Sequence, residues 1–129
     1  MSYTFGVTVP QSYEETVPAT RDALAEQGFG VLTEIDMAAT LKTKLDVDVP
    51  KMIILGACRP PLAHRAITVE PSIAAVLPCN VVVRELEDGT TRVEAFDPDV
   101  MMGVADSPVL HEVAADARER LTAALATLG

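Results

Sequence analysis

Hydrophobic and polar residues are spaced along this chain of 129 residues in ways that predict both strands and helices. Apolar side chains alternate with polar or small ones over residues 2–9, which is the period of a strand with one buried face. Ser12 and Glu15 then have the spacing of a helical capping box, and an apolar stripe of helical period follows. Because Pro18 lies in this stretch, we expect a helix that is kinked there or becomes regular only near Thr16.

The middle of the chain predicts two further strands and the segments that connect them. Residues 29–35 have the composition of a strand, and residues 37–45 predict a short helical or irregular connection. Residues 52–55 are apolar without interruption, so we expect a strand that is covered on both faces and lies inside the sheet. One or two turns of helix are expected over residues 60–67, because proline suits a first helical turn, and a loop over residues 68–78.

A hairpin is predicted next. Two strand patterns, over residues 80–87 and 90–96, are joined by Asp88-Gly89, a pair that tolerates the positive φ angles of a two-residue type I′ turn. Such a turn places Glu85 opposite Arg92, and opposite charges across a strand pair are mildly favourable.

The last segment predicts the most regular helix. Ser107-Pro108 is a suitable start, and an apolar face follows that consists of Leu110, Val113, Ala114, Ala117, Leu121, Ala124, Leu125 and Leu128. The order strand, helix, four strands, helix predicts one α+β domain over residues 1–129, with a mostly antiparallel sheet and helices on one face. The strand at residues 52–55 would then lack cover on its other face, which predicts a homodimer.

Composition narrows the function classes. With 49% hydrophobic and 22% charged residues the chain is globular rather than disordered, and no apolar run approaches the length of a membrane helix. The N-terminus has no secretory pattern, so we expect a cytoplasmic protein without a membrane partner, whose two cysteines are free thiols. A net charge of −9 argues against nucleic acid as a partner, because phosphate binding needs a basic surface.

The charge is unevenly distributed. Residues 42–65 contain five basic and two acidic side chains, a net +3, whereas the rest of the chain has five basic and seventeen acidic ones, a net −12. A small anion would be drawn to the positive segment, which includes Lys42, Lys44, Arg59 and Arg65. The alternative is a solvated loop that happens to use lysine.

Both cysteines lie in short corners at strand ends, where loops on a rigid frame can build a site. Cys58 and Arg59 follow one apolar strand, and Cys79 and Asn80 begin another. The two-residue turn brings Asp97 beside Asn80, and antiparallel strands bring the Cys58 corner to the same end of the sheet. In this register Asn80 and Asp97 face the helices and Cys79 faces away.

These corners also carry a resemblance. The chain resembles the DUF302 family, a domain of unknown function, in Leu41-Lys42-Thr43-Lys44-Leu45, Ile54-Leu55-Gly56-Ala57-Cys58-Arg59-Pro60, Glu70-Pro71, Leu77-Pro78-Cys79-Asn80-Val81-Val82-Val83 and Asp97-Pro98. Where the family usually has asparagine after the first cysteine, this chain has Arg59. The resemblance implies a TBP-like β-α-β4-α fold and homodimers, without a settled activity and without DNA binding.

Three hypotheses about function follow. The first is a small-molecule module that binds an anion through Lys42, Lys44, Cys58, Arg59, Cys79, Asn80 and Asp97. The second is a thiol-dependent or redox enzyme that uses Cys58 or Cys79, and the third is a structural or regulatory homodimer without a ligand. We prefer the first, because few residues suit acid–base catalysis.

A metal site is a weaker interpretation of the same corners. Cys58, Cys79 and His64, with Asp97 as a fourth ligand, match no zinc spacing, and free cysteines commonly pack as small apolar side chains. We therefore predict neither a metal nor a cofactor.

Overall fold

A computed structural model describes residues 2–103 and 107–129. Its centre is a five-stranded sheet in the order β1-β5-β4-β3-β2, and each neighbouring pair is antiparallel. The strands are β1 (Thr4–Val9), β2 (Gly30–Asp36), β3 (Met52–Cys58), β4 (Cys79–Glu85) and β5 (Thr91–Phe96). The predicted α+β class and antiparallel sheet are confirmed, and β3 is an interior strand as its continuous apolar run indicates.

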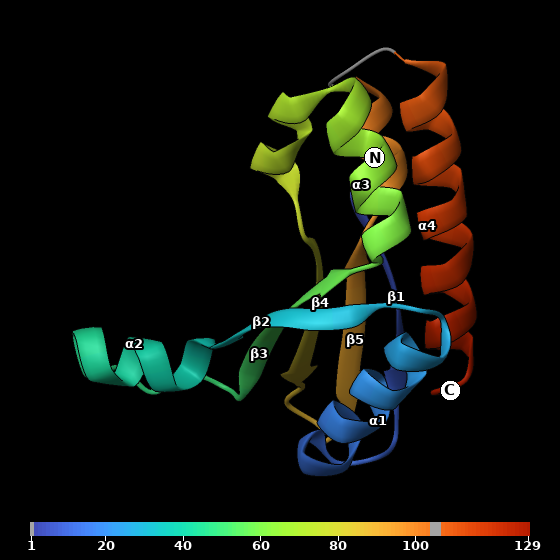
Figure 1. Cartoon of the computed structure of the whole chain (residues 1–129). Coiled ribbons are helices and arrows are strands. Elements are labelled where there is room, and N and C mark those ends of the chain that lie inside the picture. Colours follow the sequence, from blue (N-terminus) through green and yellow to red (C-terminus); the bar gives the residue numbers. More distant parts are fainter. Residues whose placement is uncertain (1, 104–106) are drawn as a thin grey trace.

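The described residues also form four α-helices: α1 (Tyr13–Glu26), α2 (Met37–Leu45), α3 (Pro60–Val69) and α4 (Pro108–Ala126). The short 3-10 helices η1 (Pro71–Val76) and η2 (Pro98–Gly103) lie in the connections, the first of them within the stretch expected to be a loop. Figure 1 shows α1, α3 and α4 against one side of the strands, whereas α2 projects away on the other side. None of the described helices is both long and apolar enough to cross a bilayer.

Helix α1 begins and ends at signals that the sequence carries. The Ser12 hydroxyl oxygen accepts a hydrogen bond from the Glu15 N–H at 3.2 Å, and the helix is continuous through Pro18, so its regular part begins at Tyr13 and not near Thr16. At the other end the Phe29 N–H donates to the Leu24 carbonyl at 3.0 Å and the Gly28 N–H to the Ala25 carbonyl at 3.0 Å, the two bonds of a Schellman motif.

The predicted turn between β4 and β5 is wrong by one residue. The Leu86 N–H donates to the Thr90 carbonyl at 2.9 Å, and the Gly89 N–H donates back to the Leu86 carbonyl at 3.1 Å. With Gly89 at φ +84°, this is a three-residue loop that ends in a left-handed residue, a hairpin type that Asp-Gly serves equally well. Glu85 therefore lies opposite Thr91 and not opposite Arg92.

This shift of one residue reverses the predicted faces of β4, because side chains alternate along a strand. Val81 and Val83 are buried under the helices, and Cys79 packs on the same side. Asn80 lies on the opposite, open face and not toward the helices as expected. On β5 the prediction that Val93 faces the helices is confirmed.

The hydrophobic core lies between the sheet and the layer formed by α1, α3 and α4. The predicted apolar face of α4 is confirmed, since Leu128 is half-buried and the others, Leu110, Val113, Ala114, Ala117, Leu121, Ala124 and Leu125, are buried. No described helix covers the second face of the sheet, where Met52 and Ile54 stay half-buried.

Candidate functional site

The two cysteine corners meet at one end of the sheet, as the antiparallel arrangement predicts. Cys79 begins β4 directly opposite Ala57, the residue before Cys58 at the end of β3. Phe96, the last residue of β5, ends at the same edge opposite Thr4, so the Asp97 corner is there as well. Helix α3 starts at Pro60, two residues after Cys58, with Arg59 as its N-cap, and its residues Leu62, Ala63 and Ala66 lie beside both cysteines.

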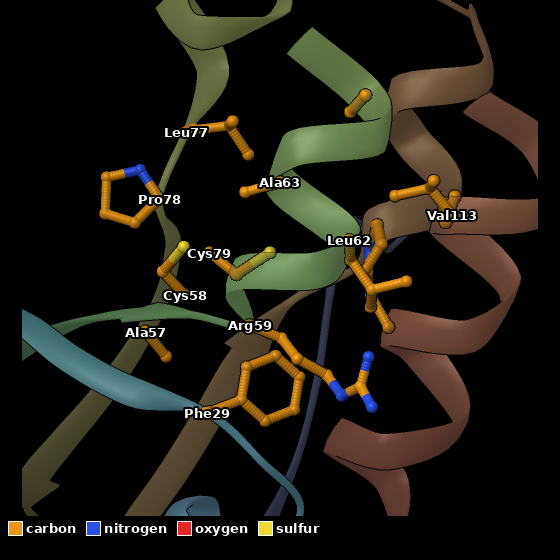
Figure 2. A pocket seen from close by; sticks show the side chains of 14 residues that line it. Phe29, Ala57, Cys58, Arg59, Leu62, Ala63, Leu77, Pro78, Cys79 and Val113 are labelled. Atoms are coloured by element: carbon orange, nitrogen blue, oxygen red, sulfur yellow. The ribbon is translucent and has the colours of Figure 1, made fainter. Parts of the chain in front are cut away.

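An apolar pocket fills the space where α3 and α4 pack over this edge (Figure 2). It encloses about 40 Å³, room for a few atoms, and is lined by Phe29, Ala57, Cys58, Arg59, Leu62, Ala63, Ala66, Leu77, Pro78, Cys79, Pro98, Val113, Ala114 and Ala117. Arg59 contributes the charge in this lining. The pocket therefore combines an apolar interior with a guanidinium group at its edge.

Arg59 occupies the N-cap position of α3 without a side-chain capping bond, and its side chain runs toward α4 (Figure 2). Its Nε is buried, and no atom in residues 2–103 or 107–129 accepts a hydrogen bond from it. Gly28, at φ +83°, gives the side chain space, because a Cβ there would lie 3.1 Å from the Arg59 Nε. A buried guanidinium donor without an acceptor is costly, and it is the site's main chemical feature.

The thiols of Cys58 and Cys79 are free, and burial favours the protonated form of both. Burial raises the pKa of Cys79 to about 11, with a further contribution from neighbouring Cys58, and burial also raises the pKa of Cys58. Since the thiolate is the nucleophile, this environment works against thiol catalysis at neutral pH.

Two other candidate residues have different surroundings. Asn80 is exposed on the open face of the sheet. Asp97 accepts a hydrogen bond from the Asp99 N–H at 3.0 Å and one from the Arg118 Nε at 3.2 Å, so it fixes the start of η2 and ties it to α4. Pro98, rather than Asp97, reaches the pocket.

The lysines do not join this site within one chain. Lys42 and Lys44 are exposed on α2, beyond the end of β2 that lies farthest from Cys58. Lys42 is already paired with two carboxylates, Asp46 at 3.0 Å and Asp48 at 3.4 Å. The two lysines and Arg59 are close in the sequence, which suggested one basic site. Strand β3 lies between them along the chain, however, so Arg59 is at the opposite end of β3 from α2.

The possible metal ligands do not gather either. Within the described parts of the chain, no three side chains of histidine, cysteine, aspartate or glutamate form a group that could hold a metal ion. His64 is exposed on α3.

The sequence reasoning missed the walls of the pocket that come from distant segments. Phe29 follows the end of α1, and Val113, Ala114 and Ala117 come from α4. The apolar stripe of α4 was recognised, but nothing in it distinguishes a residue that lines a cavity from one that fills the core.

The fold and the pocket define a class of small α+β proteins in which one antiparallel sheet carries most of its helices on one face. The sequence matches the family model of the domain of unknown function DUF302 over residues 5–128, and the chain belongs to this family. It is similar to a solved structure titled as that of an uncharacterized conserved protein DUF302 from Bacillus stearothermophilus, with a TM-score of 0.91, 31% identity and full coverage of both chains. No curated protein matches the chain.

Proposed function

We propose that this protein is a homodimeric binding module for a small anion, and that Arg59 is the residue that recognises the charge. The observation that carries the proposal is the buried Arg59 Nε, for which the described chain supplies no acceptor. A guanidinium presents its donors as a planar fork that matches a carboxylate or a phosphate. An anion at this position would remove the cost of the unpaired donor.

The helix start beside Arg59 adds little to anion binding. Pro60 and Pro61 have no N–H, and the N–H groups of Leu62 and Ala63 both donate to the Arg59 carbonyl, at 3.0 and 3.1 Å. The guanidinium is therefore the proposed hydrogen-bond donor to the anion. The N-terminus of α3 contributes only the electrostatic attraction of its partial positive charge.

The size and lining of the pocket specify the proposed ligand further. A space of about 40 Å³ takes a short apolar group, far less than the roughly 300–1,000 Å³ of a typical drug-sized site. A carboxylate on a chain of a few carbon atoms satisfies both features, with its tail among Leu62, Cys79 and Ala117 and its oxygens on Arg59. Nucleotides and larger phosphate esters are poor candidates on size, and nucleic acid is a poor candidate on charge.

Thermal unfolding with a series of anions tests this proposal. The purified protein is unfolded by heat in the presence of one anion at a time: formate, acetate, propionate, butyrate, hexanoate or inorganic phosphate. We expect the melting temperature to rise most with the short carboxylates. Arg59→Gln should abolish the rise. Arg65→Gln, on the exposed side of the same helix, is the matched control, because it removes a cation of the same helix that lies outside the pocket. Equal responses of the two variants would refute the role of Arg59.

The homodimer is proposed on a separate observation, the uncovered face of the sheet. Met52, Ile54 and Val82 lie there half-buried, and with their neighbours they line a hollow of about 420 Å³. Apolar surface of this kind commonly marks an interface. Light scattering at micromolar concentration should give twice the chain mass; the mass of one chain would contradict the homodimer and leave the anion site untouched.

A further inference from the structure

The hollow on the open face of the sheet has the size of a small-molecule site. It holds about 420 Å³, within the roughly 300–1,000 Å³ of sites that take drug-sized ligands. Strands β1, β3, β4 and β5 contribute to it, and the segment that leads into β4 adds Val76 and Pro78. Apart from Pro78 it shares no lining residue with the pocket at Arg59, so it is a separate space.

The register of the strands arranges the floor of the hollow in rows. Met52 pairs with Arg84, which in turn pairs with Arg92. In the next row on the same face, Ile54 pairs with Val82. Successive rows lie about 7 Å apart, the length of two residues of a strand. An apolar ligand that covers Ile54 and Val82 therefore reaches the guanidinium group of Arg84 with its end.

The open face differs in charge from the rest of the molecule. Arg84, Arg92 and Glu94 are the charged side chains that the described strands present on this face, a net +1. The remaining eight basic and eighteen acidic residues of the chain give a net −10. An apolar hollow beside a positive cluster, in a strongly acidic protein, favours an apolar molecule with a negative charge.

Arg84 has hydrogen-bond donors left for such a charge. Its Nε donates to the Glu94 Oε1 at 3.0 Å, and its Nη2 lies 3.0 Å from the same oxygen. Within residues 2–103 and 107–129 no atom accepts a hydrogen bond from its Nη1, and the side chain is 36% exposed. Because a guanidinium has five N–H donors in one plane, Arg84 can bind a second anionic group without releasing Glu94.

We infer that the hollow binds a flat aromatic acid, with its rings on Ile54 and Val82 and its carboxylate or sulfonate on Arg84. Flat rings suit the surface of a sheet, and Tyr3 and Phe96 in the lining offer aromatic contacts. The site lies within one chain and does not depend on Arg59 or on the homodimer. In the proposed homodimer two positive clusters would face each other, and bound acids would compensate them.

Two fluorescent probes that share one ring system test the inference. Anilinonaphthalene sulfonate carries the negative charge, and phenylnaphthylamine is the same ring system without it. We expect the sulfonate to bind the folded full chain saturably, with one molecule per chain. Its affinity should exceed that of the neutral amine about tenfold, because the amine makes no charge-assisted hydrogen bond. Equal affinities, or no binding of the sulfonate, would overturn the inference.

Substitutions locate the bound probe. Arg84→Gln should weaken sulfonate binding about tenfold and leave amine binding unchanged, whereas Ile54→Gln should weaken both. Arg65→Gln is the matched control, because it also removes one positive charge but lies on α3, outside the hollow. Circular dichroism checks that each variant is folded. If Arg84→Gln binds the sulfonate as tightly as Arg65→Gln does, the hollow is not the site and the inference is wrong.

The opposite change of charge gives an independent check that does not need Ile54→Gln to fold. Glu94→Gln removes the carboxylate that pairs with Arg84 and raises the charge of the cluster by one. The sulfonate should then bind more tightly than to the unaltered protein, and the neutral amine should bind as before. Unchanged or weaker sulfonate binding would contradict recognition of the anion by this cluster.

Discussion

Arg84 lies directly opposite Arg92 in the β4–β5 pair, and the Glu94 carboxylate lies between the two guanidinium groups. Like charges directly opposite each other destabilise a strand pair, so the arrangement depends on the shared carboxylate. Glu94 also accepts a hydrogen bond from the Thr4 hydroxyl at 3.2 Å, which extends the contact to β1. One acidic side chain thus stabilises three neighbouring strands on the open face.

Glu94→Gln should lower the free energy of unfolding by about 1 kcal/mol, because the two arginines then repel each other without compensation. Urea denaturation measures the change, and Glu87→Gln in the exposed hairpin loop is the control. The loss should shrink when Arg92→Gln is added, since one guanidinium then needs no carboxylate. A loss of the same size in the Arg92→Gln background would show that repulsion is not its cause.

The raised pKa of Cys79 predicts a pH dependence of stability. The folded protein holds this thiol proton up to about pH 11, whereas the ordinary pKa is 9.0. Between pH 9 and 11 the folded state therefore binds more protons than the unfolded state. The contribution of the Cys79 thiol to the free energy of unfolding is complete below about pH 9 and is lost as the pH rises toward 11. It amounts to at most about 2–3 kcal/mol.

Denaturation at several pH values compares the unaltered protein with Cys79→Ala. The pKa values of Tyr13 and Lys51 are raised as well, by burial for Tyr13 and by the Glu14 carboxylate for Lys51, and both groups titrate alike in the two proteins. We expect the stability of the unaltered protein to fall more steeply between pH 9 and 11. Parallel curves would mean that Cys79 titrates normally.

Asp97 is predicted to have a structural role at the corner where β5 ends. Its carboxylate caps η2 and pairs with Arg118, whose guanidinium lies 5.1 Å from the centre of the Phe5 ring. Asp97→Ala removes both contacts and should cost about 1–2 kcal/mol, whereas Asp97→Asn keeps an acceptor for the cap and should cost less. Chemical denaturation orders the two variants, and carboxylate binding should be the same in both.

Strands and helices of this fold could be predicted where burial of one face makes apolar residues recur at a regular spacing. The register between β4 and β5 could not be predicted in this way. Val93 lies on the predicted face of β5, because alternation within one strand depends on that strand alone. The pairing of β4 with β5 depended on the length of the turn, and Asp88-Gly89 suits both a two-residue and a three-residue loop. One residue in the turn then decided on which side of the sheet Cys79 and Asn80 lie.

The sequence predicted where in the fold the candidate site lies, but it did not predict which residues contact one another there. That Cys58 and Cys79 share one end of the sheet follows from an antiparallel pair of strands. The Arg59 Nε lies beside Gly28, and Phe29 lines the same pocket; both belong to a segment about thirty residues earlier in the sequence. No local pattern around Lys44 reveals that its helix projects from the sheet instead of folding back.

Gly28 links the stability of the fold to the proposed anion site. It adopts φ +83°, and a Cβ at this position would lie 3.1 Å from the Arg59 Nε. Gly89 adopts nearly the same φ, +84°, with nothing within 4 Å of an added Cβ. The two glycines therefore differ in their surroundings and not in their backbone strain.

Gly28→Ala and Gly89→Ala should each cost about 1–2 kcal/mol for a left-handed alanine, measured by urea denaturation. Gly28→Ala should cost more, because the alanine methyl group would also lie 3.1 Å from the buried Arg59 Nε and force that side chain to shift. It should also weaken the stabilisation by short carboxylates, whereas Gly89→Ala, at the opposite end of the sheet, should leave that stabilisation unchanged. If both variants bind carboxylates like the unaltered protein, the guanidinium position set by Gly28 is not what recognises the anion.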